Sequence, residues 1–127
     1  MTSVIAFPVR TYRDLEVWQR SKALVKVIYL ATQHFPKEEM YGLSSQMRRA
    51  AVSVPSNIAE GNARSTKEYI RFIDIALGSL AELETQCEIA CDLDYITQEA
   101  AGNILTETDE ITRMLGGLAA KLKARLP

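Results

Sequence analysis

The stretch from Tyr69 to Ala90, "YIRFIDIALGSLAELETQCEIA", carries the clearest periodicity in this chain. Its apolar residues recur alternately four and three positions apart, a spacing that places them on one side of an α-helix as a heptad seam. The members of this seam are Tyr69, Ile73, Ala76, Leu80, Leu83, Cys87 and Ala90. Because such a face is stable only when it is buried, the sequence predicts that other helices pack against it.

Further apolar residues lie on other sides of the same predicted helix. One group contains Ile70, Leu77 and Leu93, and another contains Phe72, Ile75 and Ile89. A single apolar stripe is enough to bury a helix in its own bundle. The additional stripes therefore predict that part of this helix meets another subunit.

The segment just before this helix, "SNIAEGNARSTKEY" (residues 56–69), has the composition of either a phosphate-binding loop or a corner between two helices. A phosphate-binding P-loop needs Gly-x-x-x-x-Gly-Lys-Ser/Thr after a strand, whereas this segment has one glycine and follows a helical pattern. We therefore predict a corner, in which Gly61 ends one helix as a left-handed cap. Ser65 and Glu68 fit a capping box that opens the next helix.

The start of a helix also offers free backbone amides to an anion. Arg64 and Lys67 stand beside the helix start predicted at Ser65. A weak phosphate site at this corner is therefore a second expectation.

Three more helices are expected. The first runs from Asp14, a plausible N-cap, to His34, and Phe35-Pro36 ends it because the residue before a proline avoids helical angles. The second begins near Lys37 or Met40 and reaches Glu60. Its apolar positions are Leu43, Met47, Ala50, Val54 and Ile58.

The last helix begins near Thr97, a suitable N-cap residue. Its apolar positions are Ile104, Ile111, Leu115, Leu118 and Leu122. No stretch alternates with period two, so no strand is expected. The sequence thus predicts an all-α protein, an antiparallel up-down four-helix bundle. The 127 residues form one domain, in which residues 1–12 are an extended N-terminal segment.

Composition excludes several protein classes. The net charge of −1 does not favour an acidic or nucleic-acid ligand for the molecule as a whole, and two cysteines are too few for a disulfide framework. No apolar run approaches the length of a membrane span, and the N-terminus has no convincing signal peptide. We therefore expect a cytoplasmic protein without a membrane partner.

The charges are nevertheless distributed unevenly. The stretch from Asp74 to Glu110 has ten acidic residues and no Lys or Arg, and the rest of the chain carries fifteen basic and six acidic residues. In an up-down bundle, one end would hold the acidic residues Asp92, Asp94 and Glu99. The opposite end would gather Arg10, Arg13, Arg64, Lys67, Arg71, Lys121, Lys123 and Arg125.

This basic end suggests a nucleic-acid-binding surface, for which Arg64, Lys67 and Arg71 are the candidate residues. Lys67 and Arg71 are one helical turn apart and share a face. The alternative is that these are solubilising charges at helix ends.

Other polar groups give weaker signals for a site. His34 is the single histidine and is expected to be exposed at a helix end, while Cys87 and Cys91 lack a second ligand pair for a metal and are expected to act as small apolar residues. Glu82, Glu84 and Glu88 lack the Glu-x-x-His partners of a di-iron bundle and are expected to form a charged face. No catalytic, cofactor-binding or metal-binding residue is predicted.

The adjacent residues Arg48 and Arg49 point about 100° apart on a helix, so they cannot serve the same partner equally. We expect one of them to pair with an acid such as Glu82 or Glu84. The other would then face a pore or a neighbouring subunit.

Several phrases resemble the four-helix bundle family encoded in intervening sequences of bacterial 23S rRNA genes. The matching phrases are Tyr41-Gly42-Leu43, Gln46-Met47-Arg48-Arg49-Ala50, Asn57-Ile58-Ala59-Glu60-Gly61 and Gly78-Ser79-Leu80-Ala81-Glu82-Leu83, and the likeness runs from about Tyr12 to Leu122. The resemblance implies an up-down bundle assembled as a ring, typically a homopentamer, without known enzymatic activity. A related branch, the accessory variability proteins of diversity-generating retroelements, binds RNA and a reverse transcriptase.

Two classes of function follow as expectations. The first is a non-catalytic oligomeric adaptor that binds RNA, DNA or another protein and needs no cofactor. The alternative is an enzyme with an unrecognised site.

Overall fold

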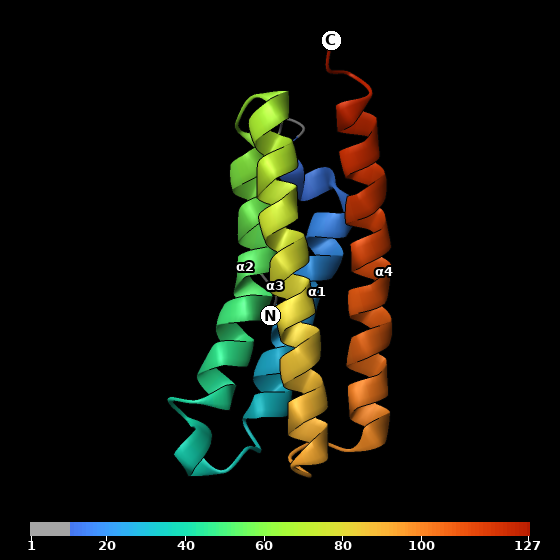
Figure 1. The fold of residues 1–127 in the computed structure, drawn as a ribbon. Coiled ribbons are helices and arrows are strands. Elements are labelled where there is room, and N and C mark those ends of the chain that lie inside the picture. The colour runs from blue at the N-terminus through green and yellow to red at the C-terminus, as the bar shows by residue number, and fades with distance from the viewer. Residues whose placement is uncertain (1–10) are drawn as a thin grey trace, which may run out of the picture.

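The computed structural model describes residues 11–127, and this part of the chain forms four α-helices and no strand (Figure 1). The helices are α1 (Glu16–Thr32), α2 (Leu43–Asn62), α3 (Thr66–Asp92) and α4 (Gln98–Lys123). Two short 3-10 turns accompany them, η1 (Tyr12–Asp14) before α1 and η2 (Lys37–Glu39) between α1 and α2. The prediction of an all-α four-helix protein is confirmed.

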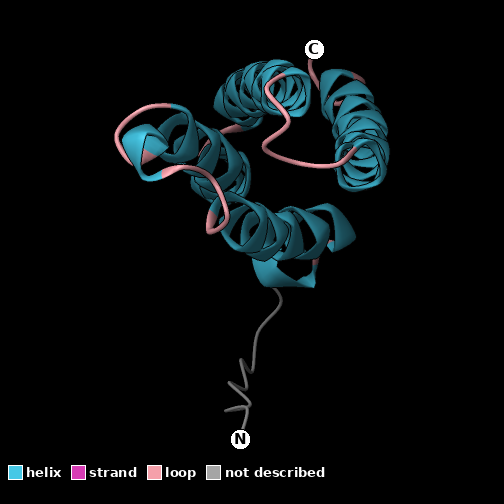
Figure 2. Cartoon of the chain, turned by 90° about the horizontal axis from the view of Figure 1, so that it is seen from below, coloured by secondary structure: helices cyan, strands magenta, loops and turns pink. Residues whose placement is uncertain are grey.

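Each helix runs in the direction opposite to the one before it, as the colours in Figure 1 show. Within the described residues, the backbones of α1 and α2, α2 and α3, α3 and α4, and α4 and α1 approach each other closely, whereas those of the diagonal pairs do not. Figure 2 looks along the bundle from the end that holds the α1–α2 and α3–α4 links. The α2–α3 corner, η1 and the last turn of α4 lie at the opposite end (Figure 1).

The core follows the apolar periodicity of the sequence. All seven residues of the heptad seam of α3 are buried, and only Tyr69 among them keeps any exposed surface, at 7%. The predicted stripe of α4 is buried at Ile104, Ile111, Leu115 and Leu122, while Leu118 is half-buried against the core. The second stripe of α3 is only partly covered by the bundle. Ile70 and Leu77 pack against the core, whereas Leu93 is exposed.

The start of α1 differs from the prediction. The N-cap is Leu15 without a side-chain bond, and Asp14 belongs to η1, where its carboxylate accepts a hydrogen bond from the backbone N–H of Thr11. Thr11 caps η1 with its own hydroxyl, so a separate turn satisfies these amides before α1 begins. Of the predicted extended segment, residues 1–10 lie outside the described residues. Thr11 has extended angles, and η1 begins at Tyr12.

The corner at residues 56–69 is confirmed as a link between two helices, but its details differ from the prediction. α2 continues to Asn62 and ends at Ala63 in a right-handed conformation, so Gly61 is not a left-handed cap. Gly61 is a buried residue inside the helix, and a Cβ atom there would lie 2.7 Å from Cβ of Phe72 and 3.0 Å from Cδ1 of Tyr69. The missing side chain lets α2 approach α3 closely.

The start of α3 shows half of the predicted capping box. Ser65 is the N-cap, and its hydroxyl accepts a hydrogen bond from the N–H of Glu68 at 3.3 Å. The side chain of Glu68 pairs with Arg71 instead of returning to the cap. The N-cap of α4 is Thr97, as predicted, with its hydroxyl 3.1 Å from the N–H of Ala100.

One carboxylate connects the two links at the other end of the bundle. Glu39 accepts hydrogen bonds from the N–H of Leu43 at 3.1 Å and from the hydroxyl of Tyr95 at 2.8 Å. The first contact caps α2, and the second ties the α1–α2 link to the α3–α4 link. The bond to Glu39 also raises the pKa of Tyr95. Among the described helices, none has a long enough apolar run to cross a bilayer.

Candidate functional site

The three predicted nucleic-acid-binding residues lie together at the α2–α3 corner. Arg64 follows the last turn of α2, and Lys67 and Arg71 occupy the first turns of α3. All three are exposed to solvent. Lys67 and Arg71 share one side of α3 because they are separated by a single helical turn.

Two of these three cations already have partners within the chain. Arg64 pairs with Glu60 at 3.0 Å, and its guanidinium carbon lies 5.2 Å from the centre of the Phe72 ring. Arg71 pairs with Glu68 at 3.4 Å, with 70% of the arginine side chain exposed. Lys67 has no ion pair or hydrogen bond to the described residues. Exposed pairs of this kind contribute little to stability, so both arginines can exchange their partners for another anion.

Other cations lie at the same end of the bundle. Lys121 and Lys123 are exposed in the last turn of α4, and Arg125 follows that helix. Arg13 lies in η1, with its guanidinium 4.7 Å from the centre of the Tyr12 ring. Arg10, which was predicted to join this group, lies outside the described residues. We refer to Arg13, Arg64, Lys67, Arg71, Lys121, Lys123 and Arg125 as the basic end.

The opposite end is acidic, as the sequence predicts. Asp92 closes α3, Asp94 follows it with a positive φ of 61°, and Glu99 lies in the first turn of α4. Glu38 and Glu39 of η2 are at this end as well. The two ends of the bundle therefore carry opposite charge even though the net charge of the chain is −1.

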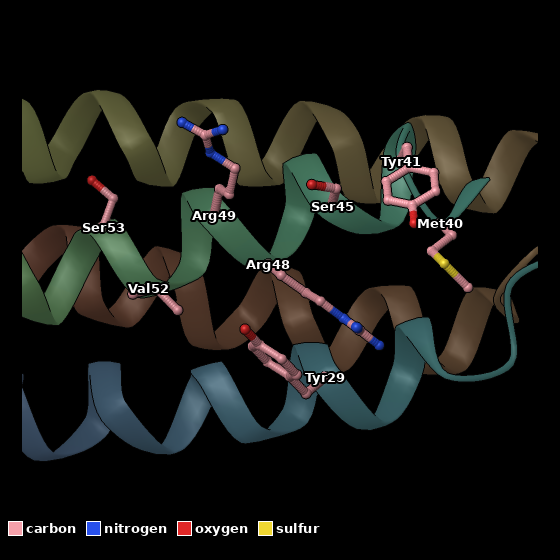
Figure 3. A pocket seen from close by; sticks show the side chains of 8 residues that line it. All are labelled: Tyr29, Met40, Tyr41, Ser45, Arg48, Arg49, Val52 and Ser53. Atoms are coloured by element: carbon pink, nitrogen blue, oxygen red, sulfur yellow. The ribbon is translucent and has the colours of Figure 1, made fainter.

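A second feature is a groove beside α2, lined by residues of α1, α2 and the segment that joins them (Figure 3). Its residues are Tyr29, Met40, Tyr41, Ser45, Arg48, Arg49, Val52 and Ser53. Tyr41 is 92% exposed, and Tyr29, Met40 and Val52 are also exposed. The groove therefore places apolar surface and two cations in contact with solvent.

Arg48 and Arg49 point in different directions from α2 (Figure 3). Arg48 reaches α1, where its Nε donates a hydrogen bond to Oγ1 of Thr32 at 2.8 Å and its guanidinium carbon lies 4.6 Å from the centre of the Tyr29 ring. Arg49 points away from α1, is exposed, and has no hydrogen bond or ion pair to any residue within 11–127.

The prediction that one arginine pairs with Glu82 or Glu84 is wrong for the described residues. Arg48 points toward α1, where it donates a hydrogen bond to the hydroxyl of Thr32 and places its guanidinium over the ring of Tyr29. Glu84 lies on the other flank of α3 and accepts a hydrogen bond from the hydroxyl of Thr108 on α4 at 2.8 Å. Glu82 is exposed and accepts only a long bond of 3.5 Å from the amide of Gln86.

The remaining candidate groups behave as structural residues. Cys87 is fully buried, and loss of hydration raises the pKa of its thiol to about 11, with smaller contributions from Cys91, Glu88 and Glu84. Cys91 is half-buried, and His34 is exposed beyond the end of α1 as predicted. In the part of the chain that the structure describes, no three His, Cys, Asp or Glu side chains gather as a metal site would require.

Sequence reasoning missed the groove beside α2. Its aromatic and cationic residues come from three segments, and only the packing of α1 on α2 brings them together. One signal was present, since Met40 and Tyr41 follow each other at a predicted helix start, where a buried residue is not required.

Comparisons with known proteins bear on the fold and the family. The family model described as "23S rRNA-intervening sequence protein" matches residues 13–117. A crystal structure of a protein of unknown function of the S23 ribosomal protein family, from Bacteroides thetaiotaomicron, is 26% identical in sequence. The two structures superpose with a TM-score of 0.73, covering 81% of this chain and 97% of the other. A search of curated proteins gives no match.

Proposed function

This chain belongs to the 23S rRNA-intervening sequence protein family, and we propose that it is a non-catalytic, self-assembling bundle that binds nucleic-acid phosphates at its basic end. The observation that carries the proposal is the separation of charge along the bundle. The α2–α3 corner and the last turn of α4 bring exposed cations to one end, and the acidic residues lie at the other.

The contacts at the corner support binding that is weak and independent of sequence. Arg64 and Arg71 hold exposed carboxylates, and such pairs are worth little in water. A phosphate oxygen would replace the carboxylate with a charge-assisted hydrogen bond. The amides at the start of α3 also favour an anion, since the helix dipole is positive there.

Self-assembly is supported by apolar residues that the bundle leaves uncovered. Ile75 and Ile89 on α3 are 42% and 43% exposed, and Leu93 is 50% exposed. These are members of the extra stripes that suggested contact with another subunit. We propose a homo-oligomer, and the family resemblance favours five copies, whose ring would repeat the basic end around its axis.

The nucleic-acid proposal is tested by changing Arg64, Lys67 and Arg71 together to Glu. Wild-type protein should bind RNA or DNA at low salt, about 50 mM, and lose affinity steeply as salt increases, because neutralised phosphates release counterions. The triple variant should not bind, while its circular dichroism and assembled mass stay unchanged.

The matched control alters charge at the opposite end. Changing Asp92 and Asp94 to Asn removes two negative charges without touching the corner, and this variant should bind at least as well as wild type. If wild-type protein binds neither RNA nor DNA at low salt, the basic end only solubilises the bundle. The partner would then be a protein, for which the groove beside α2 offers the exposed aromatic surface.

The assembly proposal has its own measurement. Light scattering at micromolar concentration should give several times the chain mass of 14.2 kDa. A monomer at all concentrations up to the millimolar range would contradict it. We propose no enzymatic reaction, because no arrangement of side chains among residues 11–127 favours one type of reaction over another.

A further inference from the structure

Arg49 and Glu82 are two opposite charges that lie on one face of the bundle without an ionic partner. Arg49 forms no ion pair or hydrogen bond within the described residues, and Glu82 accepts only the long bond from Gln86. Both side chains are exposed. Two other arginines on or next to these helices are already matched, in the pairs Arg64–Glu60 and Arg71–Glu68.

The two residues are level with each other along the bundle. The hydroxyl oxygens of Ser53 on α2 and Ser79 on α3 are 2.8 Å apart, which fixes the register of these antiparallel helices. Arg49 lies four residues before Ser53 on α2, and Glu82 lies three residues after Ser79 on α3. They therefore stand at about the same height, yet their charged groups are not within 4.0 Å of each other.

Exposed apolar residues lie on the same side of α3 as Glu82. On α3, Ile75 and Ile89 lie seven residues before and after Glu82, so all three share one side of the helix. Because the two charges are opposite, Arg49 of one copy can attract Glu82 of the next in a head-to-tail contact, and exposed apolar side chains beside them give that contact surface to bury.

The carboxylate of Glu82 has unused hydrogen-bonding capacity. Among the described residues it accepts only the 3.5 Å bond from the amide nitrogen of Gln86, one helical turn further along α3. A guanidinium has five N–H donors in a fixed fork and can bind a carboxylate with two of them. An arginine of another copy can therefore pair with Glu82 without displacing a partner.

We propose that Arg49 of one copy binds Glu82 of a second copy, and that the α2–α3 face around these residues is the surface through which this chain assembles. The inference rests on the proposed self-assembly and specifies its interface. Ile75 and Ile89 are the apolar residues that the contact covers. A nucleic-acid backbone is not the occupant of this face, because the phosphates that Arg49 would attract are repelled by Glu82 and by the exposed Asp74.

Charge reversal and its reciprocal swap test the pair. Arg49→Glu and Glu82→Arg should each weaken self-association by about tenfold or more, because each places like charges opposite each other in the interface. The double variant Arg49→Glu, Glu82→Arg restores the attraction with reversed polarity. Its dissociation constant should return to within about threefold of wild type if the two sites are coupled.

Dissociation constants are obtained from light scattering and sedimentation over a dilution series. The matched control is Arg113→Glu on α4, an equally large charge change at an arginine whose side chain is 72% exposed. This variant should assemble like wild type. Circular dichroism and thermal melting of every variant separate loss of assembly from loss of folding.

The outcomes distinguish this inference from the proposed function. An assembled wild type whose mass is unaffected by either single reversal overturns the interface and leaves self-assembly standing. A monomeric wild type overturns both. Single reversals that lower the melting temperature without changing the assembled mass would mean that the two residues pair within one chain, and this result also contradicts the proposal.

Discussion

At the scale of single residues, Gly61 determines how closely α2 and α3 approach. Its position faces the Cβ of Phe72 and the ring of Tyr69, both of which belong to α3. The contact to Phe72 is the more restrictive, because a Cβ atom moves only with its backbone. This close packing also positions the α2–α3 corner that follows, which contains Arg64 and Lys67.

We predict that Gly61→Ala destabilises the bundle. Alanine improves helix propensity by about 1 kcal/mol, but the added methyl would lie 2.7 Å from Cβ of Phe72, and overpacking of this kind costs about 1–3 kcal/mol. The clash should be the larger effect, so the urea midpoint should fall. Gly116→Ala on α4 is the matched control, because a methyl group there would meet no neighbouring helix or side chain within 4 Å, and this variant should be more stable than wild type.

Cys87 gives a prediction about alkaline pH. Burial holds the thiol neutral and raises its pKa from 9.0 to about 11. A raised pKa in the folded state means that folding is favoured below pH 9, and that this contribution is lost as the pH rises through about 11. The Cys87→Ala variant has no thiol at this position, so its stability does not have this pH-dependent contribution. The difference in urea midpoint between wild type and Cys87→Ala should therefore shrink between pH 8 and pH 11, and a constant difference would contradict the burial of this thiol.

At the scale of the helices, the seam of α3 organises the core. Leu80 and Leu83 have no exposed surface and lie in the middle of this helix, which is in contact with both α2 and α4. The seam of α3 therefore contributes to the packing against two neighbouring helices at once.

Leu80→Ala should therefore lower the free energy of unfolding by about 2–5 kcal/mol, as removal of a fully buried side chain leaves a cavity. Val27→Ala on α1 provides the comparison, because Val27 is 47% exposed and its truncation should have little effect. Denaturant unfolding followed by circular dichroism measures both. Equal midpoints for the two variants would show that the seam does not form the core.

The sequence predicted the helices well because apolar periodicity and capping are local properties. The seam of α3, Ser65 and Thr97 were identified from residues within a few positions of one another. Gly61 and Asp14 were misassigned, since the first depends on Phe72 and the second on an additional turn at Thr11. Arg48 shows the same limit, because its partners Thr32 and Tyr29 belong to α1 and are far from it in sequence.

At the scale of the whole molecule, the proposed self-assembly would strengthen the proposed binding of phosphates. Each copy brings its own basic end, with Arg64, Lys67 and Arg71 at the corner. One copy offers few contacts, each of them weak. Several copies linked through the α2–α3 face would present these contacts at a high effective concentration to a single nucleic-acid strand.

The Arg49→Glu variant tests this coupling because it alters assembly while leaving the basic end intact. For a single-stranded RNA, the plot of log affinity against log salt should have a slope of about −0.7 for each phosphate contacted. Three contacts in one copy would give a slope of about −2, and an assembly that engages several copies a steeper one. Arg49→Glu should therefore bind more weakly and with a shallower slope than wild type, whereas Arg113→Glu, which carries the same charge change, should retain the wild-type slope. If Arg49→Glu is monomeric and still shows the wild-type affinity and slope, each copy binds alone, and assembly serves a purpose other than collecting phosphate contacts.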